Sequence, residues 1–398
     1  MKLPHLRAWW AARQGLLTLD PGQTPAAVLE RSGWARSVGG VNPYLTLFSR
    51  AGTSRAAADQ AAADRRIHEL PGARGCTYVV PAADFELALR LGRGTGDAPE
   101  LRSAKKYLGV TDAEVDRLCA KVLDALDGGA RDPAALKTTL GDAVRNLGPE
   151  GKKRGMTTTL PLALGRLQVL GEILRQPQGG RFDQQRYAYV RWRESPVRAL
   201  GLDLDAALAA LARKYFRWIG PATAAQFQEF AGLGVKAAKA ALGPLGLVPL
   251  EKDSPLLLFP DDRDALAAFE PPEDPVYRLI SPIDGLVLHR RDLASHLEPA
   301  DAKRKVLGDK GMTDMGSLGD LPGHAIVDRG RVVGLWEYDH DAGAIAWTAF
   351  VKPTPALEAE VARTEAFIRD QLGDARSFSL DSPESRRPRI AAIRQASA

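Results

Sequence analysis

The chain has 398 residues, and because a domain usually has about 150 residues, we expect more than one domain. Its content of 45% apolar and 26% charged residues is that of an ordinary globular protein and argues against a disordered or fibrous chain. The 54 basic and 49 acidic residues leave a net charge of +5, which is compatible with an anionic partner without identifying one.

The N-terminal segment, from Met1 to Gly15, carries charges and two tryptophans where a secretion signal needs an unbroken apolar core. No run of about 18 apolar residues, the length of a membrane-spanning helix, occurs in the sequence. We therefore expect a cytoplasmic protein without a membrane partner.

A helix and two strands are predicted in the first part of the chain. Thr53–Ala62 has a helical pattern, and the segments Arg66–Leu70 and Cys76–Val80 enclose the turn Pro71–Gly75. A glycine-rich linker, Gly92–Gly96, follows. This order of elements is that of a winged helix, so residues 1–95 are predicted to be a first winged-helix domain.

The same order of elements returns in residues 96–200, predicted to be a second winged-helix domain. Asp132 before Pro133 predicts the start of a helix that runs toward Leu147. A basic loop then precedes a helix over Thr157–Leu170, and the strands Glu172–Gln176 and Arg186–Trp192 enclose a turn.

The clearest pattern lies in residues 201–270, predicted to be a third winged-helix domain. Apolar residues at helical spacing over Asp205–Ile219 predict a helix that ends at Gly220 and Pro221. Thr223 and Gln226 have the spacing of a capping box and open a second helix. A third helix, Val235–Leu242, and the strands Leu247–Leu250 and Leu256–Phe259 complete the unit.

After Pro275 the pattern changes to a β-rich domain, residues 271–398. A long amphipathic helix is predicted over Ala356–Leu372. The predicted strands are Tyr277–Ile280, Ala325–Val327, Val332–Tyr338 and Ala344–Phe350. The fold class is therefore α+β, with three tandem winged helix-turn-helix domains before the C-terminal domain.

Basic residues concentrate where winged-helix domains contact phosphates. The candidates for DNA contact are Lys152, Lys153, Arg154, Thr157, Arg191, Arg193, Lys236, Lys239, Arg386 and Arg387. Thr157 is expected in the first turn of a helix, where free backbone N–H groups bind anions. The strand with Arg191 and Arg193 is expected to carry a cationic face opposite an aromatic one. The alternatives are a solvated loop around Lys153 and a solvated C-terminal tail around Arg386.

The sequence gives no support for a metal site or a disulfide framework. The six histidines are scattered, and neither an H-E-x-x-H motif nor paired C-x-x-C motifs occur. The two cysteines, Cys76 and Cys119, lie in segments predicted to be different domains. We expect no metal and a reducing compartment.

Several short segments together resemble one bacterial family, the helix-turn-helix DNA glycosylases of the AlkZ/YcaQ type. They are Arg13–Leu16, Pro43–Leu45 with Arg50, Arg74–Asp84, Arg213–Phe216, Gly220–Thr223, Ser281–Asp284 and Gly334–Trp336. The resemblance implies a C-shaped protein of three winged helices and a C-terminal β-barrel-like domain. It also implies excision of alkylated purines and unhooking of interstrand crosslinks, without a metal or redox cofactor.

The sequence departs from that family at the catalytic motif. The family has two polar residues, glutamine and glutamine or aspartate, that position the attacking water shortly before the Pro43–Leu45 segment. The corresponding stretch here, Gly33–Asn42, has neither glutamine nor carboxylate. Asn42 is the nearby amide that can take over the water, and Arg36 and Ser37 are candidates for contact with the phosphate of an abasic site.

The leading hypothesis is a monomeric protein that binds double-stranded, damaged DNA and hydrolyses the N-glycosidic bond of a damaged purine. The first alternative is a non-catalytic winged-helix DNA-binding protein, a lesion sensor or a transcriptional regulator. The second is a scaffold that contacts other proteins only. Base release would support the leading hypothesis. Salt-sensitive duplex binding without base release would support the first alternative, and no duplex binding would support the second.

Overall fold

The computed structural model describes residues 1–94, 98–184, 186–198, 201, 203–308 and 311–397. The N-terminal region is a helical unit around the three-stranded antiparallel sheet β1-β3-β2. Its elements are α1 (Leu3–Arg13), α2 (Pro25–Ser32), β1 (Ala35–Arg36), α3 (Asn42–Ala51), α4 (Arg55–Ala63), β2 (Ile67–Pro71), β3 (Thr77–Pro81) and α5 (Phe85–Arg93). The predicted pair of strands is confirmed.

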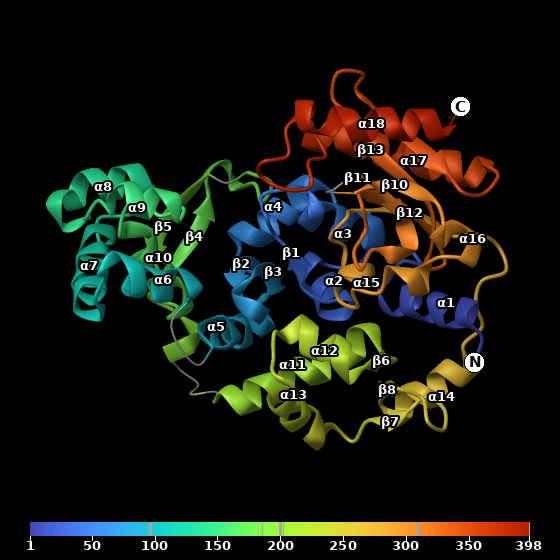
Figure 1. Ribbon diagram of the computed structural model, residues 1–398, viewed down its shortest axis with the longest axis horizontal. Helices are drawn as coiled ribbons and strands as arrows, with labels where there is room; N and C mark the ends of the chain where they lie inside the picture. Colours follow the sequence, from blue (N-terminus) through green and yellow to red (C-terminus); the bar gives the residue numbers. More distant parts are fainter. Residues whose placement is uncertain (95–97, 185, 199–200, 202, 309–310, 398) are drawn as a thin grey trace.

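Residues 99–191 form a helical lobe that reaches the rest of the molecule through an antiparallel hairpin (teal and green in Figure 1). The hairpin consists of β4 (Ile173–Pro177) and β5 (Tyr187–Arg191). The helices are α6 (Pro99–Leu108), α7 (Asp112–Leu126), α8 (Pro133–Leu140), α9 (Gly148–Lys153) and α10 (Leu160–Val169). Asp132 caps α8 as predicted, with its side chain accepting from the Ala135 N–H at 2.8 Å.

Two boundaries in this lobe were predicted wrongly. The helix that begins at Pro133 ends at Leu140, where Gly141 follows with a positive φ. The predicted basic loop is instead the short helix α9. The next helix begins at Leu160, so Thr157 lies before it rather than in its first turn.

The third region has the predicted helices, and the capping box between Thr223 and Gln226 is confirmed in both directions. The sheet here has the order β6-β8-β7. Its elements are α11 (Leu204–Ile219), β6 (Ala222–Thr223), α12 (Ala224–Ala231), α13 (Val235–Leu242), β7 (Val248–Pro249), β8 (Leu256–Leu258) and α14 (Pro260–Ala268).

The C-terminal region is built on a four-stranded antiparallel sheet with the order β14-β13-β12-β9. Its strands are β9 (Tyr277–Ile280), β12 (His324–Asp328), β13 (Arg331–Asp339) and β14 (Ala344–Ala349), and β10 (Lys305–Gly308) pairs with β11 (Gly311–Asp314) in a separate hairpin. The helices are α15 (Gly285–Leu288), α16 (Pro299–Ala302), α17 (Pro355–Phe367) with a π-helical extension (Ile368–Leu372), and α18 (Pro383–Ser397).

The expected barrel is not closed by the strands that the structure describes. The four-stranded sheet has β14 at one edge and β9 at the other, and the described pairings do not join them. The predicted solvated C-terminal tail is also wrong, because α18 packs on β13 and β14 (red in Figure 1).

Short 3₁₀ helices connect these elements: Ala73–Gly75, Ala82–Asp84, Gly141–Ala143, Gln178–Gly180, Pro196–Arg198, Gly243–Leu245, Leu293–His296 and Met315–Ser317. The predicted boundaries after residues 95 and 200 fall at positions outside the described residues. The lobe has a hydrophobic core of its own, from Leu101 to Tyr189. The other hydrophobic cores combine distant segments, as where α1 packs with Leu258 and Val332.

A buried ion pair joins the N-terminal and C-terminal regions. The Arg50 guanidinium at the end of α3 donates two hydrogen bonds of 2.8 Å to the Asp284 carboxylate, which also caps α15. Gln14 accepts a further bond from Arg50 at 3.2 Å. Burial acts to raise the pKa of Asp284, but the charge of Arg50 together with the hydrogen bonds from Arg50 and the Leu286 N–H outweighs burial and lowers that pKa. Three of the segments that carry the family resemblance therefore meet in one structural joint.

The turn of the β4–β5 hairpin is docked into the body of the molecule. Phe182 is fully buried, and its N–H donates to the Tyr44 hydroxyl at 3.0 Å. Arg181 donates to the carbonyl of Leu372 at 2.8 Å, and the Arg376 guanidinium donates to the carbonyl of Asp183. The hairpin therefore bridges the lobe, α3 and the segment after α17.

Candidate functional site

The three predicted catalytic residues lie where the chain passes from β1 to α3: Arg36 ends β1, Ser37 follows it, and Asn42 begins α3. Asn42 is buried at the start of α3, and its amide donates to the carbonyl of Arg36 at 2.7 Å. Its side-chain oxygen accepts from the Ser281 hydroxyl at 2.6 Å. Asn42 therefore ties the loop to the C-terminal region, and both polar atoms of its side chain are occupied.

The second predicted residue, Ser37, donates a hydrogen bond to the carboxylate of Glu69. The sheet register explains this contact. Ala35 and Glu69 both lie opposite Val79 on the central strand β3, so the side chains of Ala35, Ser37 and Glu69 belong to one face of the sheet. Sequence reasoning missed Glu69. The available signal was a carboxylate inside a strand that also carries the apolar residues Ile67 and Leu70.

The Glu69 carboxylate is covered by the β4–β5 hairpin. Its side chain is 1% exposed, and the Arg175 guanidinium approaches its Oε2 atom to 3.5 Å. Arg175 also stacks over the ring of Tyr187 at 4.0 Å. Burial and then the charge of Glu69 raise the pKa of Tyr187, so this phenol is neutral at physiological pH. Ser37 donates to Oε1, so Oε2 is the carboxylate oxygen that Arg175 approaches.

Arg36, the third predicted residue, is half-buried and lies opposite Tyr78, so its side chain belongs to the other face of the sheet from Ser37 and Glu69. Its guanidinium donates to the carbonyl of Thr77 at 2.9 Å and lies 5.4 Å from the centre of the Tyr78 ring. We call Ser37, Glu69, Arg175 and Tyr187 the Glu69 cluster. It combines a carboxylate, two hydroxyls and one cation, groups that can hold a water.

Four described histidines are buried, His68, His289, His296 and His324, and burial lowers the pKa of three of them to about 4: His68, His289 and His296. These three are called the buried histidines below. At neutral pH they are uncharged, so they provide neither a cation nor a general acid.

The predicted basic cluster lies on the lobe, on and directly after α9. Lys152, Lys153 and Arg154, the α9 basic cluster, are all exposed. Glu150 forms ion pairs with Lys153 at 3.6 Å and with Arg154 at 2.9 Å. Arg154 also stacks on the ring of Tyr107 at 3.9 Å. Two cationic charges therefore remain in excess at this surface.

Thr157 is exposed, but its carbonyl accepts from the Leu147 N–H at 2.9 Å. It lies outside α10, so it does not add a helix N-terminus to the α9 basic cluster.

The other predicted DNA contacts are dispersed. Arg191 and Arg193 share the carboxylate of Asp127, at 3.5 and 2.8 Å. Arg191 has the same strand parity as Tyr187 and Tyr189, so the expected separation of a cationic from an aromatic face is wrong. Lys236 and Lys239 are exposed on α13.

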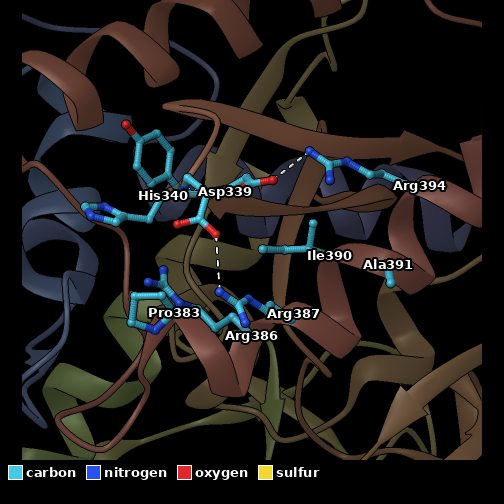
Figure 2. Close-up of a pocket in the computed structure, with 10 residues that line it drawn as sticks. Asp339, His340, Pro383, Arg386, Arg387, Ile390, Ala391 and Arg394 are labelled. Carbon is cyan, nitrogen blue, oxygen red and sulfur yellow. Dashed lines mark hydrogen bonds and ion pairs between the residues drawn. The ribbon is translucent and has the colours of Figure 1, made fainter.

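Three arginines of α18, Arg386, Arg387 and Arg394, line a surface pocket of about 570 Å³ at the turn after β13 (Figure 2). Arg387 forms an ion pair with Asp341 at 3.5 Å, and Arg394 with Asp339 at 2.6 Å. Arg386 is fully buried against Asp374 at 2.7 Å, so a phosphate cannot reach it at the surface. None of the described lining residues belongs to the Glu69 cluster.

In the part of the chain that the structure describes, no group of three or more histidine, cysteine, aspartate or glutamate side chains is placed to hold a metal ion. None of the described helices is long and apolar enough to cross a membrane.

Comparison with known proteins gives one family and one fold. The family model "DNA glycosylase AlkZ-like" matches residues 37–368. No curated protein matches the sequence. The solved structure of the Streptomyces sahachiroi DNA glycosylase AlkZ is similar, with a TM-score of 0.71 and 21% sequence identity, over 93% of this chain and 97% of that chain. At this identity the structural likeness is evidence for the fold alone.

Proposed function

Because the chain belongs to the AlkZ-like DNA glycosylase family, we propose that it binds damaged double-stranded DNA and hydrolyses the N-glycosidic bond of a modified purine. The observation that carries the catalytic half is the Glu69 carboxylate, fixed by Ser37 at the loop where the family has its water-positioning residues. We also propose that the protein is a cytoplasmic monomer of three winged helices and a C-terminal domain, with boundaries near residues 95, 200 and 270.

In this proposal the base departs with the electron pair of the glycosidic bond and leaves an oxocarbenium-like sugar. The Glu69 carboxylate stabilises that charge and accepts one proton from a water, whose oxygen bonds to the sugar carbon. Ser37 holds the carboxylate, and Asn42 holds the loop rather than the water. Arg36 contributes a cation for a backbone phosphate. This revises the prediction that the Asn42 amide itself positions water.

Access to Glu69 sets a requirement on the substrate. Arg175 and Tyr187 cover the carboxylate, so the target nucleotide has to displace them from Oε2. Extrusion of a nucleotide costs a few kcal/mol and is cheapest where damage has already weakened stacking or pairing. The covered site therefore favours damaged over intact DNA.

The test is base release from a duplex with an alkylated purine, and from a crosslinked duplex, by the wild type and by Glu69→Gln. Glutamine keeps the shape but cannot accept the proton, so release should fall by about 10²- to 10⁴-fold. Glu100→Gln is the control, because it removes an exposed carboxylate on α6. Release by Glu69→Gln at the wild-type rate would disprove the role of Glu69.

A second candidate function is a non-catalytic duplex-binding protein, a lesion sensor or regulator. It is favoured by the occupied side chain of Asn42 and by the ion pair over Glu69. It predicts binding that weakens steeply with salt and no base release above the buffer rate.

A further inference from the structure

Two large apolar side chains are exposed on one turn between the π-helical extension of α17 and α18. Phe378 is 44% exposed and Leu380 is 84% exposed. Single exposed apolar residues are normal at protein surfaces. Phe378 and Leu380 are separated by Ser379 alone, and we call this exposed pair the apolar tip. Its contact with water is unfavourable, and burial against a partner would remove that cost.

The turn is anchored at its base by buried ion pairs. The Asp381 N–H donates to the carbonyl of Phe378 at 3.0 Å, and the Asp381 carboxylate accepts from the Ser377 N–H at 3.0 Å. Arg389 of α18 contacts both Asp381 at 2.7 Å and Glu337 of β13 at 2.8 Å. The apolar tip therefore sits on the C-terminal sheet as a fixed projection.

The same turn lies directly against the loop of the Glu69 cluster. The Ser379 N–H donates to the carbonyl of Val38 at 3.0 Å, and the Val41 N–H donates to the carbonyl of Arg376 at 2.9 Å. The contact leaves no room for a side chain at Gly40, because a Cβ there would lie 2.2 Å from the carbonyl oxygen of Ser377. The tip is thus placed next to the loop that carries Ser37 and leads to Asn42.

We propose that Phe378 and Leu380 form a wedge that enters the base stack of duplex DNA beside the target nucleotide. This inference rests on the proposed function, because it needs a duplex over the Glu69 cluster. Extruding a nucleotide leaves a gap in the stack, and apolar side chains are the groups that proteins insert between unstacked bases. Stacking on Phe378 and burial of Leu380 offset part of the cost of unstacking.

The experiment measures destacking without chemistry. A duplex carries 2-aminopurine, whose fluorescence rises on unstacking, next to an abasic-site analogue, and all proteins also carry Glu69→Gln. We expect a rise on binding that is absent in Phe378→Ala/Leu380→Ala, together with about tenfold weaker binding to this duplex, the size of one aromatic–base stack. Binding to an intact duplex should stay unchanged.

Two further variants make the outcome specific. Exchanging the two residues, Phe378→Leu/Leu380→Phe, keeps an apolar tip and should keep the fluorescence rise. Leu3→Ala, at an exposed position of α1, should have no effect. An equal rise in the double alanine variant, or no rise with any protein, overturns the wedge. If the fluorescence rise depends on the apolar tip but the protein with Glu69 releases no base, the wedge stands and the proposed glycosylase activity is rejected.

Discussion

Removing the charge of Asp284 should loosen the joint between the N-terminal and C-terminal regions. The substitution Asp284→Asn is nearly isosteric, and asparagine can still accept from the Leu286 N–H as the cap of α15. What it removes is the negative partner of Arg50, whose side chain is 2% exposed. The experiment therefore isolates the ion pair from the cap.

The size of the effect follows from what remains around Arg50. After the substitution its guanidinium keeps neutral acceptors only: Gln14 at 3.2 Å, Ser49 at 3.0 Å and the carbonyl of Thr46 at 3.3 Å. Breaking a buried ion pair from one side costs about 3–5 kcal/mol, because the other charge stays buried without compensation. Arg50→Met should cost a similar amount by isolating Asp284. The double variant leaves neither charge and should recover most of the loss.

The free energy of unfolding is measured by urea denaturation at pH 7, followed by tryptophan fluorescence, for the wild type, both single variants and the double variant. Residues in one ion pair should be strongly non-additive. If each single variant loses about 3–5 kcal/mol and the double variant loses less than either, the coupling in this cycle exceeds about 3 kcal/mol. Losses below about 1 kcal/mol in the single variants, as for exposed pairs, or a double variant equal to the sum of the singles, would refute the reasoning.

Two further predictions concern pH and salt. The buried histidines have a pKa of about 4 in the folded protein and about 6.5 in the unfolded chain, which therefore binds more protons below pH 6.5. Stability should be complete above pH 6.5 and fall toward pH 4, by about 2 kcal/mol per histidine at pH 5; urea titrations that give the same stability at pH 7 and pH 5 would contradict this. Replacing the three residues of the α9 basic cluster with alanine should make duplex binding less sensitive to salt. The slope of the logarithm of the binding constant against log salt should become less steep by about 0.9 for each phosphate that the cluster neutralises, as measured by fluorescence anisotropy on a duplex. Lys121→Ala on α7 is the matched control, and an unchanged slope in the cluster variant would place the duplex elsewhere.

Local signals in the sequence predicted local structure well. The capping box at Thr223 and the cap at Asp132 each involve atoms three residues apart, and both are confirmed. The strand Tyr277–Ile280 was predicted with its observed limits, because its apolar residues are bounded by prolines. Short-range chemistry of this kind depends only on neighbouring residues, so the sequence is sufficient to predict it.

Contacts between distant segments could not be predicted in the same way. Nothing near Glu69 in the sequence indicates that Ser37 and Arg175 meet it, since the sheet register and a hairpin from the lobe bring them together. Arg386 belongs to a strongly charged stretch that is typical of a solvated tail. Its burial depends on Asp374 and on the sheet beneath α18.

The docked turn of the β4–β5 hairpin has a consequence for the order in which a nascent chain can assemble. The hairpin itself is local, but Phe182 contacts Tyr44 across 138 residues and Arg181 contacts Leu372 across 191 residues. The contacts around this turn are therefore complete only after nearly the whole chain has been synthesised. Until then the turn has only the contacts that α3 supplies through Tyr44, and a chain released before Leu372 leaves it incompletely covered and more prone to aggregate.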